Sequence, residues 1–174
     1  MALEKAIRTA IECEVKVRDV YRNAARTITD EQGRKVVERL AEEEQEHVDY
    51  LTARLKEWKQ TGVVTHEPVP RMTPGPDIVS HTVAALVDHM QALPGRGVDQ
   101  ASDLQMLQRA LEVERETSGF YQRMVDELPA EHQTMFRRFL EIERGHLAIV
   151  EAEIDSVRGM GFWFGLPEFD LENE

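Results

Sequence analysis

The sequence is poor in cysteine, in basic residues and in long apolar runs, and each shortage excludes a class of protein. Its only cysteine is Cys13, so a single chain can form neither a disulfide framework nor a Cys-x-x-Cys metal site. No apolar run approaches the roughly 18 residues of a membrane-spanning helix. The 21 Lys and Arg residues against 33 Asp and Glu leave a net charge of -12, which argues against nucleic acid and anionic membranes as partners.

The beginning of the chain and its composition indicate an intracellular helical protein. The first ten residues, MALEKAIRTA, hold Glu4 and Lys5 where a signal peptide would need an apolar stretch, so we expect a cytoplasmic protein. Charged residues make up 31% and aromatic residues 6%, which suits helices with long solvated faces. A length of 174 residues is enough for one domain with a full core.

Apolar residues recur at spacings of three and four along most of the chain, which predicts four long helices. The expected ranges are 3–28, 29–61, 102–128 and 129–158. Capping boxes in TDEQ and SDLQ predict that the second helix begins at Thr29 and the third at Ser102. Pro129 suits the first turn of the fourth helix. Short connections join the first helix to the second and the third to the fourth, so each pair should form an antiparallel hairpin.

The segment 62–101 between the hairpins is rich in proline and glycine. A short apolar stripe inside it predicts an extra helix, with Val79, Val83, Leu86, Met90 and Leu93 on one face. A linker of this length can run back along a bundle about 45 Å tall, as one long crossover between the hairpins requires. We therefore predict an all-α fold: a four-helix bundle in residues 1–158, followed by a tail in residues 159–174.

The two halves of the chain resemble each other. AIECEVKVRDVY at 10–21 aligns without a gap with ALEVERETSGFY at 110–121. LAEEEQEH at 40–47 aligns in the same way with FLEIERGH at 139–146. A duplicated helical hairpin is the simplest interpretation, and it predicts a pseudo-twofold axis between the halves.

Each helix carries an acidic residue near the middle of its apolar stripe, and two helices add a histidine one turn later. The residues concerned are Glu14 and Glu114 on the first and third helices, and Glu44, His47, Glu143 and His146 on the second and fourth. Because the stripe faces the core, all six side chains should point inward. The neighbouring acids Glu12, Glu42, Glu43, Glu46, Glu112 and Glu141 fall off the stripes and should lie on solvated faces.

Four bare carboxylates in a core would be costly, or would have to stay protonated. The stripes hold no Lys or Arg to pair with them, whereas two divalent ions would balance their charge. The Glu-x-x-His spacing places both donors on one helix face, and two single Glu helices with two Glu-x-x-His helices are a known di-metal arrangement. The alternative is a buried Glu–His network without metal.

The segments LAEEEQEHVDYL and FLEIERGH resemble the second-helix and fourth-helix signatures of rubrerythrins, a branch of the ferritin-like superfamily. The resemblance covers residues 1–158 and implies a ferritin-like four-helix bundle. It makes the six residues metal ligands: Glu14, Glu44, His47, Glu114, Glu143 and His146. The two Glu of the Glu-x-x-His motifs would bridge two iron ions.

Two departures from the rubrerythrin pattern bear on function. Thr117 stands where rubrerythrins usually carry a further Glu, so the site resembles the six-ligand centre of bacterioferritins. A single cysteine cannot build a rubredoxin-type iron site, so a separate electron-donor protein is implied. We expect a di-iron oxidoreductase that reduces hydrogen peroxide in the oxidative-stress response. The alternatives are a ferroxidase acting with dioxygen, an iron-handling protein, and a non-enzymatic metal-binding bundle; manganese or zinc could replace iron.

Two tyrosines and the tail complete the candidates. Tyr21 and Tyr121 each follow a predicted ligand Glu by seven residues on the same stripe. The resemblance implies that they bond ligand carboxylates or handle electrons, and the alternative is an ordinary core tyrosine. The tail GFWFGLPEFDLENE is dense in aromatic residues, so it should dock on its own bundle or on a second subunit of a homodimer or larger homo-oligomer.

Overall fold

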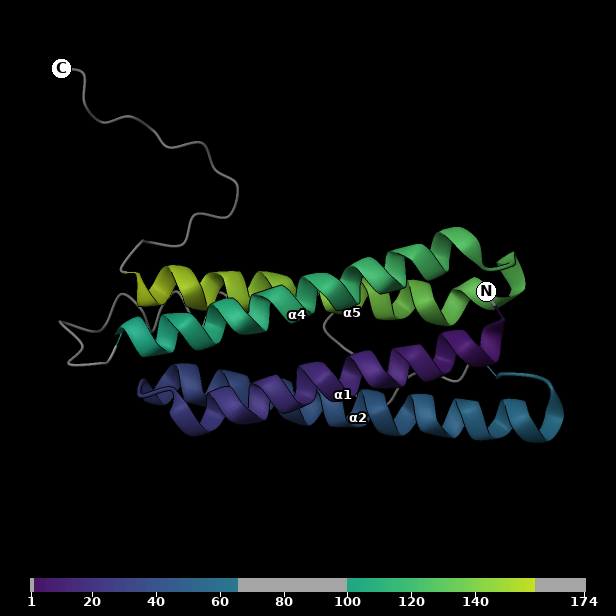
Figure 1. The fold of residues 1–174 in the computed structure, drawn as a ribbon, viewed down its shortest axis with the longest axis horizontal. Coiled ribbons are helices and arrows are strands. Elements are labelled where there is room, and N and C mark those ends of the chain that lie inside the picture. The colour runs from purple at the N-terminus through teal and green to yellow at the C-terminus, as the bar shows by residue number, and fades with distance from the viewer. Residues whose placement is uncertain (1, 66–99, 159–174) are drawn as a thin grey trace, which may run out of the picture.

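The computed structural model describes residues 2–65 and 100–158, except for the side chains of Gln32 and Gln100. This part of the chain forms four helices and no strand: α1 (Leu3–Thr27), α2 (Glu31–Thr61), α4 (Gln100–Glu127) and α5 (Ala130–Val157). Figure 1 shows the α1–α2 hairpin lying along the α4–α5 hairpin. The predicted all-α four-helix bundle is confirmed. None of the described helices is apolar over the length that crossing a bilayer would take.

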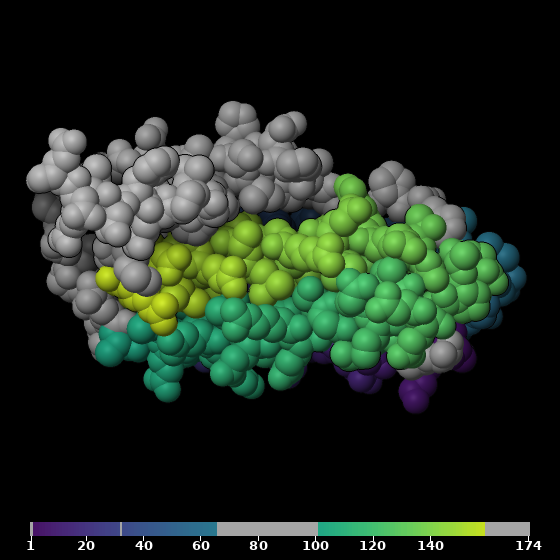
Figure 2. All heavy atoms as spheres, turned by 90° about the horizontal axis from the view of Figure 1, so that it is seen from above, coloured from purple at the N-terminus to yellow at the C-terminus, as the bar shows by residue number. Residues whose placement is uncertain are grey.

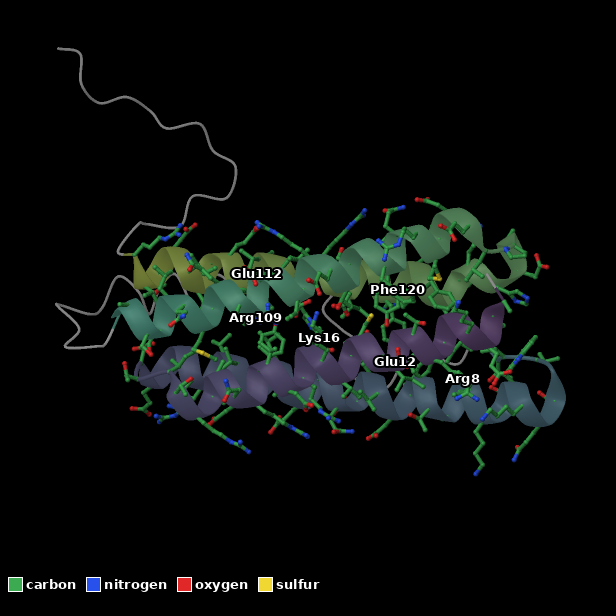
Figure 3. The ribbon with its side chains drawn as sticks, viewed as in Figure 1. Arg8, Glu12, Lys16, Arg109, Glu112 and Phe120 are labelled. Atoms are coloured by element: carbon green, nitrogen blue, oxygen red, sulfur yellow. The ribbon has the colours of Figure 1, made fainter. Side chains whose placement is uncertain are left out.

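The helices pack closely in three pairs, namely α1 with α2, α4 with α5, and α1 with α4. Figure 2 shows α4 and α5 side by side along the molecule. Figure 3 shows the face where α1 meets α4, and there Lys16 of α1 reaches up to α4, where its ammonium pairs with Glu116. The pair α2 and α5 is not among the closely packed ones.

The core has two apolar clusters, one toward each end of the bundle. On α1 the first cluster ends at Ala10 and the second begins at Val17. On α5 the first ends at Leu140 and the second begins at Ile149. The buried residues Glu14 of α1 and Glu143 and His146 of α5 lie between these limits, in a polar layer across the middle of the bundle.

The first turn of α2 differs from the predicted one. The N-cap residue is Asp30, whose side chain accepts a hydrogen bond from the backbone N–H of Gly33 at 2.7 Å. Thr29, the predicted cap, lies outside the helix, and its N–H and hydroxyl donate to Asp103 at 2.9 and 3.0 Å. The prediction was wrong because a carboxylate one residue later makes the same bond as a threonine hydroxyl, and with a negative charge at the helix N-terminus.

The predicted cap of α4 was also wrong, although the helix begins within two residues of the expected position. The helix already includes Gln100, so Ser102 lies within its first turn and does not cap it. Asp103 is fully buried and also accepts from the N–H of Asp30 at 3.1 Å. The carboxylate of the SDLQ segment thus satisfies the turn between α1 and α2, and ties the two hairpins together.

The remaining helix ends agree with the predictions to within one or two residues. The α2 helix ends before Gly62, which has φ +70° and donates its N–H to the carbonyl of Trp58 at 2.8 Å. This left-handed conformation suits glycine, which has no Cβ to clash. Pro129 directly precedes α5 as its N-cap. The predicted crossover helix and the aromatic tail lie outside the described residues.

Candidate metal centre

All six predicted ligands are buried in the polar layer, and they come from all four helices. The exposed fraction is 0% for Glu14, Glu44, Glu114 and Glu143, and 2% for His47 and His146. No Lys or Arg of residues 2–65 and 100–158 is buried, so neither residue type accompanies these carboxylates into the core. Four buried acids with only two imidazoles are an arrangement that needs further positive charge.

One half of the centre forms around His47 of α2. Its Nδ1 lies 3.1 Å from Oε2 of Glu14 on α1 and 3.1 Å from Oε2 of Glu44, one helical turn before it. The same nitrogen lies 4.0 Å from Oε1 of Glu143 on α5. The edge of the His47 ring packs against Phe139, with ring centroids 5.3 Å apart.

The other half forms around His146 of α5. Its Nδ1 lies 2.7 Å from Oε1 of Glu44 and 3.7 Å from Oε1 of Glu114. The first contact is short, yet neither atom makes a hydrogen bond, because the angles do not allow one. The two imidazole rings are stacked, with centroids 5.7 Å apart and planes inclined by 12°.

The ligand atoms fall into two overlapping groups, within each of which all atoms lie no more than 4.8 Å apart. The first group contains Glu14, Glu44, His47 and Glu143, and the second contains Glu44, Glu114, Glu143 and His146. Glu44 and Glu143 belong to both groups. Two neighbouring positions that share two carboxylates have the chemistry of a di-metal site.

The tyrosines bond to carboxylates across the hairpins. Tyr21 of α1 donates its hydroxyl hydrogen to Oε1 of Glu114 on α4. Reciprocally, Tyr121 of α4 donates to Oε1 of Glu14 on α1. Both tyrosines are fully buried. The two bonds are the pattern that a pseudo-twofold relation between duplicated hairpins would produce.

Several polar atoms of the centre make no hydrogen bond within the part of the chain that the structure describes. They are Oε1 of Glu44, Oε2 of Glu114, both carboxylate oxygens of Glu143, and both ring nitrogens of His146. Buried polar groups of folded proteins are almost always satisfied, so a cluster of unsatisfied acceptors requires an explanation. Cation binding is one, since oxygen and imidazole donors of this kind are common metal ligands. The residues therefore fit a di-metal centre.

The pKa values show how strongly these groups perturb one another. Burial, and then repulsion by Glu44, raises the pKa of Glu14. Burial, with repulsion by the other three carboxylates, raises the pKa of Glu143 well above its usual range. Burial alone would lower the pKa of His47, but the carboxylates, Glu44 first, raise it to about 10. Glu44 differs from the other carboxylates. Burial alone would raise its pKa, but the two imidazoles hold it well below the usual range.

Glu43 is a neighbour of the centre that the sequence analysis assigned to a solvated face. It is only partly exposed, and its Oε2 lies 3.4 Å from Nε2 of His146. The apolar stripe could not reveal it, because residue 43 is rotated by about 100° from residue 44 around the helix axis. A signal was present in the repeat: the corresponding residue of the second half, Ile142, is apolar, which marks the position as partly buried.

The other acidic residues that lie off the apolar stripes were expected on solvated faces, and all but one of them are exposed. Glu12, Glu42, Glu112 and Glu141 are exposed, whereas Glu46 is partly buried. Cys13 is partly buried against the first apolar cluster. Burial, and then the charge of Glu14, raises the pKa of the Cys13 thiol to about 11, so the thiolate form is disfavoured.

The fold and the site together define a ferritin-like helical bundle with a buried carboxylate–histidine cluster of the di-metal type. A family model described as Rubrerythrin matches residues 5–154, and the chain belongs to the rubrerythrin family. A solved structure of a hypothetical protein from Pyrococcus furiosus is similar over 94% of each chain, with a TM-score of 0.62 and 22% identity, which supports the fold. None of the curated proteins compared with the chain matches it.

Proposed function

We propose that the cluster binds two iron ions, with Glu44 and Glu143 shared between them. One position would be completed by Glu14 and His47, and the other by Glu114 and His146. The observation that carries this proposal is the pair of overlapping donor groups, in which half of the buried carboxylate oxygens make no hydrogen bond. Two divalent ions would supply four positive charges to four carboxylates, leaving both histidines free to bind as neutral imidazoles.

The proposed reaction is the reduction of hydrogen peroxide, with electrons from a separate donor protein. Two iron ions held there would supply a pair of electrons within one buried site. The protein residues would hold the ligands and keep bulk water out: Phe139 packs against the His47 ring, and the two apolar clusters close the layer from both ends. Tyr21 and Tyr121 each bind one oxygen of a carboxylate of the cluster, which fixes its orientation. The second oxygen of Glu114 makes no hydrogen bond, and that of Glu14 faces Nδ1 of His47.

A second candidate is the oxidation of ferrous ions by dioxygen. Thr117, one helical turn after Glu114, is buried with 2% exposure and takes the place of a carboxylate that would extend the ligand set. With six donors the set resembles that of ferroxidase centres more than the larger rubrerythrin set. Manganese is also compatible, because carboxylate and imidazole ligands do not discriminate strongly between the two metals.

The decisive experiment is an anaerobic ferrous titration followed by stopped-flow oxidation of the loaded protein with peroxide and, separately, with dioxygen. Two irons per chain that are oxidised much faster by peroxide would support the peroxidase proposal. Faster oxidation by dioxygen, with repeated turnover of added iron, would favour the ferroxidase. Binding without either reaction would leave a non-enzymatic metal-binding bundle, and no stoichiometric binding would contradict the proposal.

Variants of α2 test the ligand assignment. Glu44→Ala and His47→Ala should each lower the iron stoichiometry and abolish rapid oxidation, because each removes a donor that neighbouring groups cannot replace. Glu42→Ala is the matched control, since Glu42 is an exposed carboxylate on the same helix. Wild-type stoichiometry and turnover in both ligand variants would contradict the assigned site.

A further inference from the structure

The two histidines of the centre are counterparts in the sequence repeat, but their surroundings differ. Nε2 of His146 faces the carboxylate of Glu43, with 3.4 Å between the nitrogen and Oε2. The residue that corresponds to Glu43 in the second half is Ile142. In the described part of the chain, His47 has ion-pair contacts only through Nδ1, which faces the ligand carboxylates. Among residues 2–65 and 100–158, therefore, His146 has an acidic neighbour outside the cluster and His47 has none.

The orientation of His146 gives this neighbour a role. Its Nδ1 points to the ligand carboxylates, 2.7 Å from Glu44, while its Nε2 points the opposite way to Glu43. The Nε2 atom is buried and makes no hydrogen bond at its present angle. Glu43 is partly exposed and can turn, and its other oxygen accepts from Nε of Arg39 at 3.0 Å. A slight rotation would make Glu43 the acceptor for an Nε2–H group.

The physical consequence concerns metal affinity. A histidine ligand that donates its outer N–H to a carboxylate is held in one tautomer and one orientation, and its other nitrogen becomes a stronger donor. We propose that Glu43 is a positioning residue that makes the Glu114–His146 half of the centre the tighter metal position, so that the first ion binds there. This inference rests on the proposed di-metal function. It adds an order in which the two metal positions are occupied. The six ligands alone would not produce such an order, because the two positions have nearly the same donors.

A carboxylate could also act merely by adding negative charge near the site, and Glu42 is the control for that effect. It is adjacent in sequence, exposed, and bound to the same Arg39, with 3.3 Å between Nη1 and Oε2. Glu43→Gln and Glu42→Gln therefore remove the same charge from the same helix and the same arginine. Only Glu43 reaches His146. Both substitutions are isosteric and lie outside the apolar core, so the bundle should fold.

The experiment is an anaerobic titration of the metal-free full chain with cobalt(II), followed by calorimetry and by the absorption bands of the bound ion. The wild type should bind two ions with unequal affinities. Glu43→Gln should weaken the tighter position by about 10- to 100-fold and change its absorption bands, as loss of an outer carboxylate partner does elsewhere. Glu42→Gln should bind like the wild type.

Combining Glu43→Gln with each histidine variant shows which of the two metal positions the substitution affects. In His47→Ala the remaining tight ion should still be weakened by Glu43→Gln, whereas in His146→Ala the same substitution should have no effect. Equal wild-type affinities, equal effects of Glu43→Gln and Glu42→Gln, or an effect in both backgrounds would overturn the inference while leaving the di-metal centre intact. Failure of the wild type to bind cobalt would instead overturn the di-metal function itself, and the inference with it.

Discussion

At the scale of single residues, the reciprocal tyrosine–glutamate bonds are the contacts that most directly join the two hairpins in the core. Tyr21 donates to Glu114 and Tyr121 donates to Glu14, each from one hairpin to the other. Without the hydroxyl, a fully buried carboxyl group would lose a hydrogen-bond partner. Such a loss costs more than the net value of an ordinary hydrogen bond, because the remaining group stays desolvated.

We predict that Tyr21→Phe and Tyr121→Phe each lower the free energy of unfolding of the metal-free protein by about 1–3 kcal/mol. Phenylalanine keeps the ring, so packing contacts such as that of Tyr121 stacked on Phe139 at 5.1 Å should persist. Urea unfolding followed by circular dichroism measures the change. The two variants can be compared directly, because each removes one hydroxyl that donates to a buried carboxylate of the other hairpin. If neither substitution destabilises the protein, the hydroxyls do not satisfy the carboxylates.

The six clustered residues could be predicted from the sequence because each lies at the centre of a long apolar stripe, where helical periodicity determines the direction of a side chain. The partners of Tyr21 and Tyr121 could not be predicted in the same way. A hydrogen bond between helices depends on their relative height and rotation, which the pattern of one helix does not contain. Glu43 was missed for a related reason: its contact with His146 exists only because α5 lies beside α2 at that level.

At the scale of the helix, the predicted stripe of α4 drifts away from the observed one. A seven-residue repeat that includes Glu114 and Tyr121 also places Leu111 and Ser118 on the core-facing stripe, but both are only partly buried. Val113, Thr117 and Met124 are buried instead. At 100° per residue, Leu111 and Ser118 lie about 60° and 40° from Glu114 on one side of the helix, whereas Thr117 and Met124 lie about 60° and 80° from it on the other side. The buried face of α4 is therefore wider than the predicted stripe and is centred to one side of it, and Glu114 falls within both.

Two glycines within helices give a prediction about local packing. Replacing a helical glycine with alanine usually stabilises a protein by about 0.5–1 kcal/mol. At Gly119 of α4 the added Cβ would meet only the flexible Arg123 side chain, at 3.7 Å, so Gly119→Ala should give this gain. At Gly33 of α2 it would lie 3.3 Å from Oδ2 of Asp30 and 3.4 Å from Oε2 of Glu153, so Gly33→Ala should give no gain or a loss.

Thermal unfolding of the two variants beside the wild type checks this difference. Gly119→Ala is the matched control for Gly33→Ala, since both substitutions add one methyl group to a helix. If both substitutions stabilise the protein equally, the side chains of Asp30 and Glu153 can move aside for the new methyl group without a loss of stability. The first turn of α2 would then be looser than its hydrogen bonds indicate.

At the scale of the whole molecule, the metal centre should be independent of the aromatic tail. The six predicted ligands all lie on α1, α2, α4 and α5, within residues 14–146. Deletion of residues 162–174 should therefore leave the iron stoichiometry unchanged, as measured by anaerobic titration of the full-length and shortened chains. Size-exclusion chromatography of both proteins would show whether the tail contributes to assembly. Loss of metal binding on deletion would mean that the tail supports the bundle itself.

The buried cluster should also determine how stability depends on pH. The pKa of Glu14 rises from 4.5 to about 8, chiefly through burial. The pKa of His47 rises from 6.5 to about 10, because the ligand carboxylates, Glu44 first, outweigh the effect of burial. In both cases the folded protein holds a proton that the unfolded chain releases at lower pH, so the free energy of unfolding must fall as pH rises. Glu44 has a lowered pKa, and its stabilising contribution is lost only as pH falls below its ordinary value of 4.5.

We therefore predict that the metal-free protein becomes steadily less stable from about pH 4.5 to about pH 10, and most steeply between about pH 6.5 and pH 8, where both groups contribute. Loading with cobalt(II) should remove or reverse this trend, because metal ions bind the deprotonated ligands and compete with protons. Urea unfolding at several pH values, with and without metal, measures both slopes. Glu143→Gln should flatten the metal-free slope, since burial raises the pKa of Glu143 as well. A metal-free protein that gains stability toward pH 9 would mean that these carboxyl groups are already ionised in the fold, and that the cluster tolerates its charge without protons or metal.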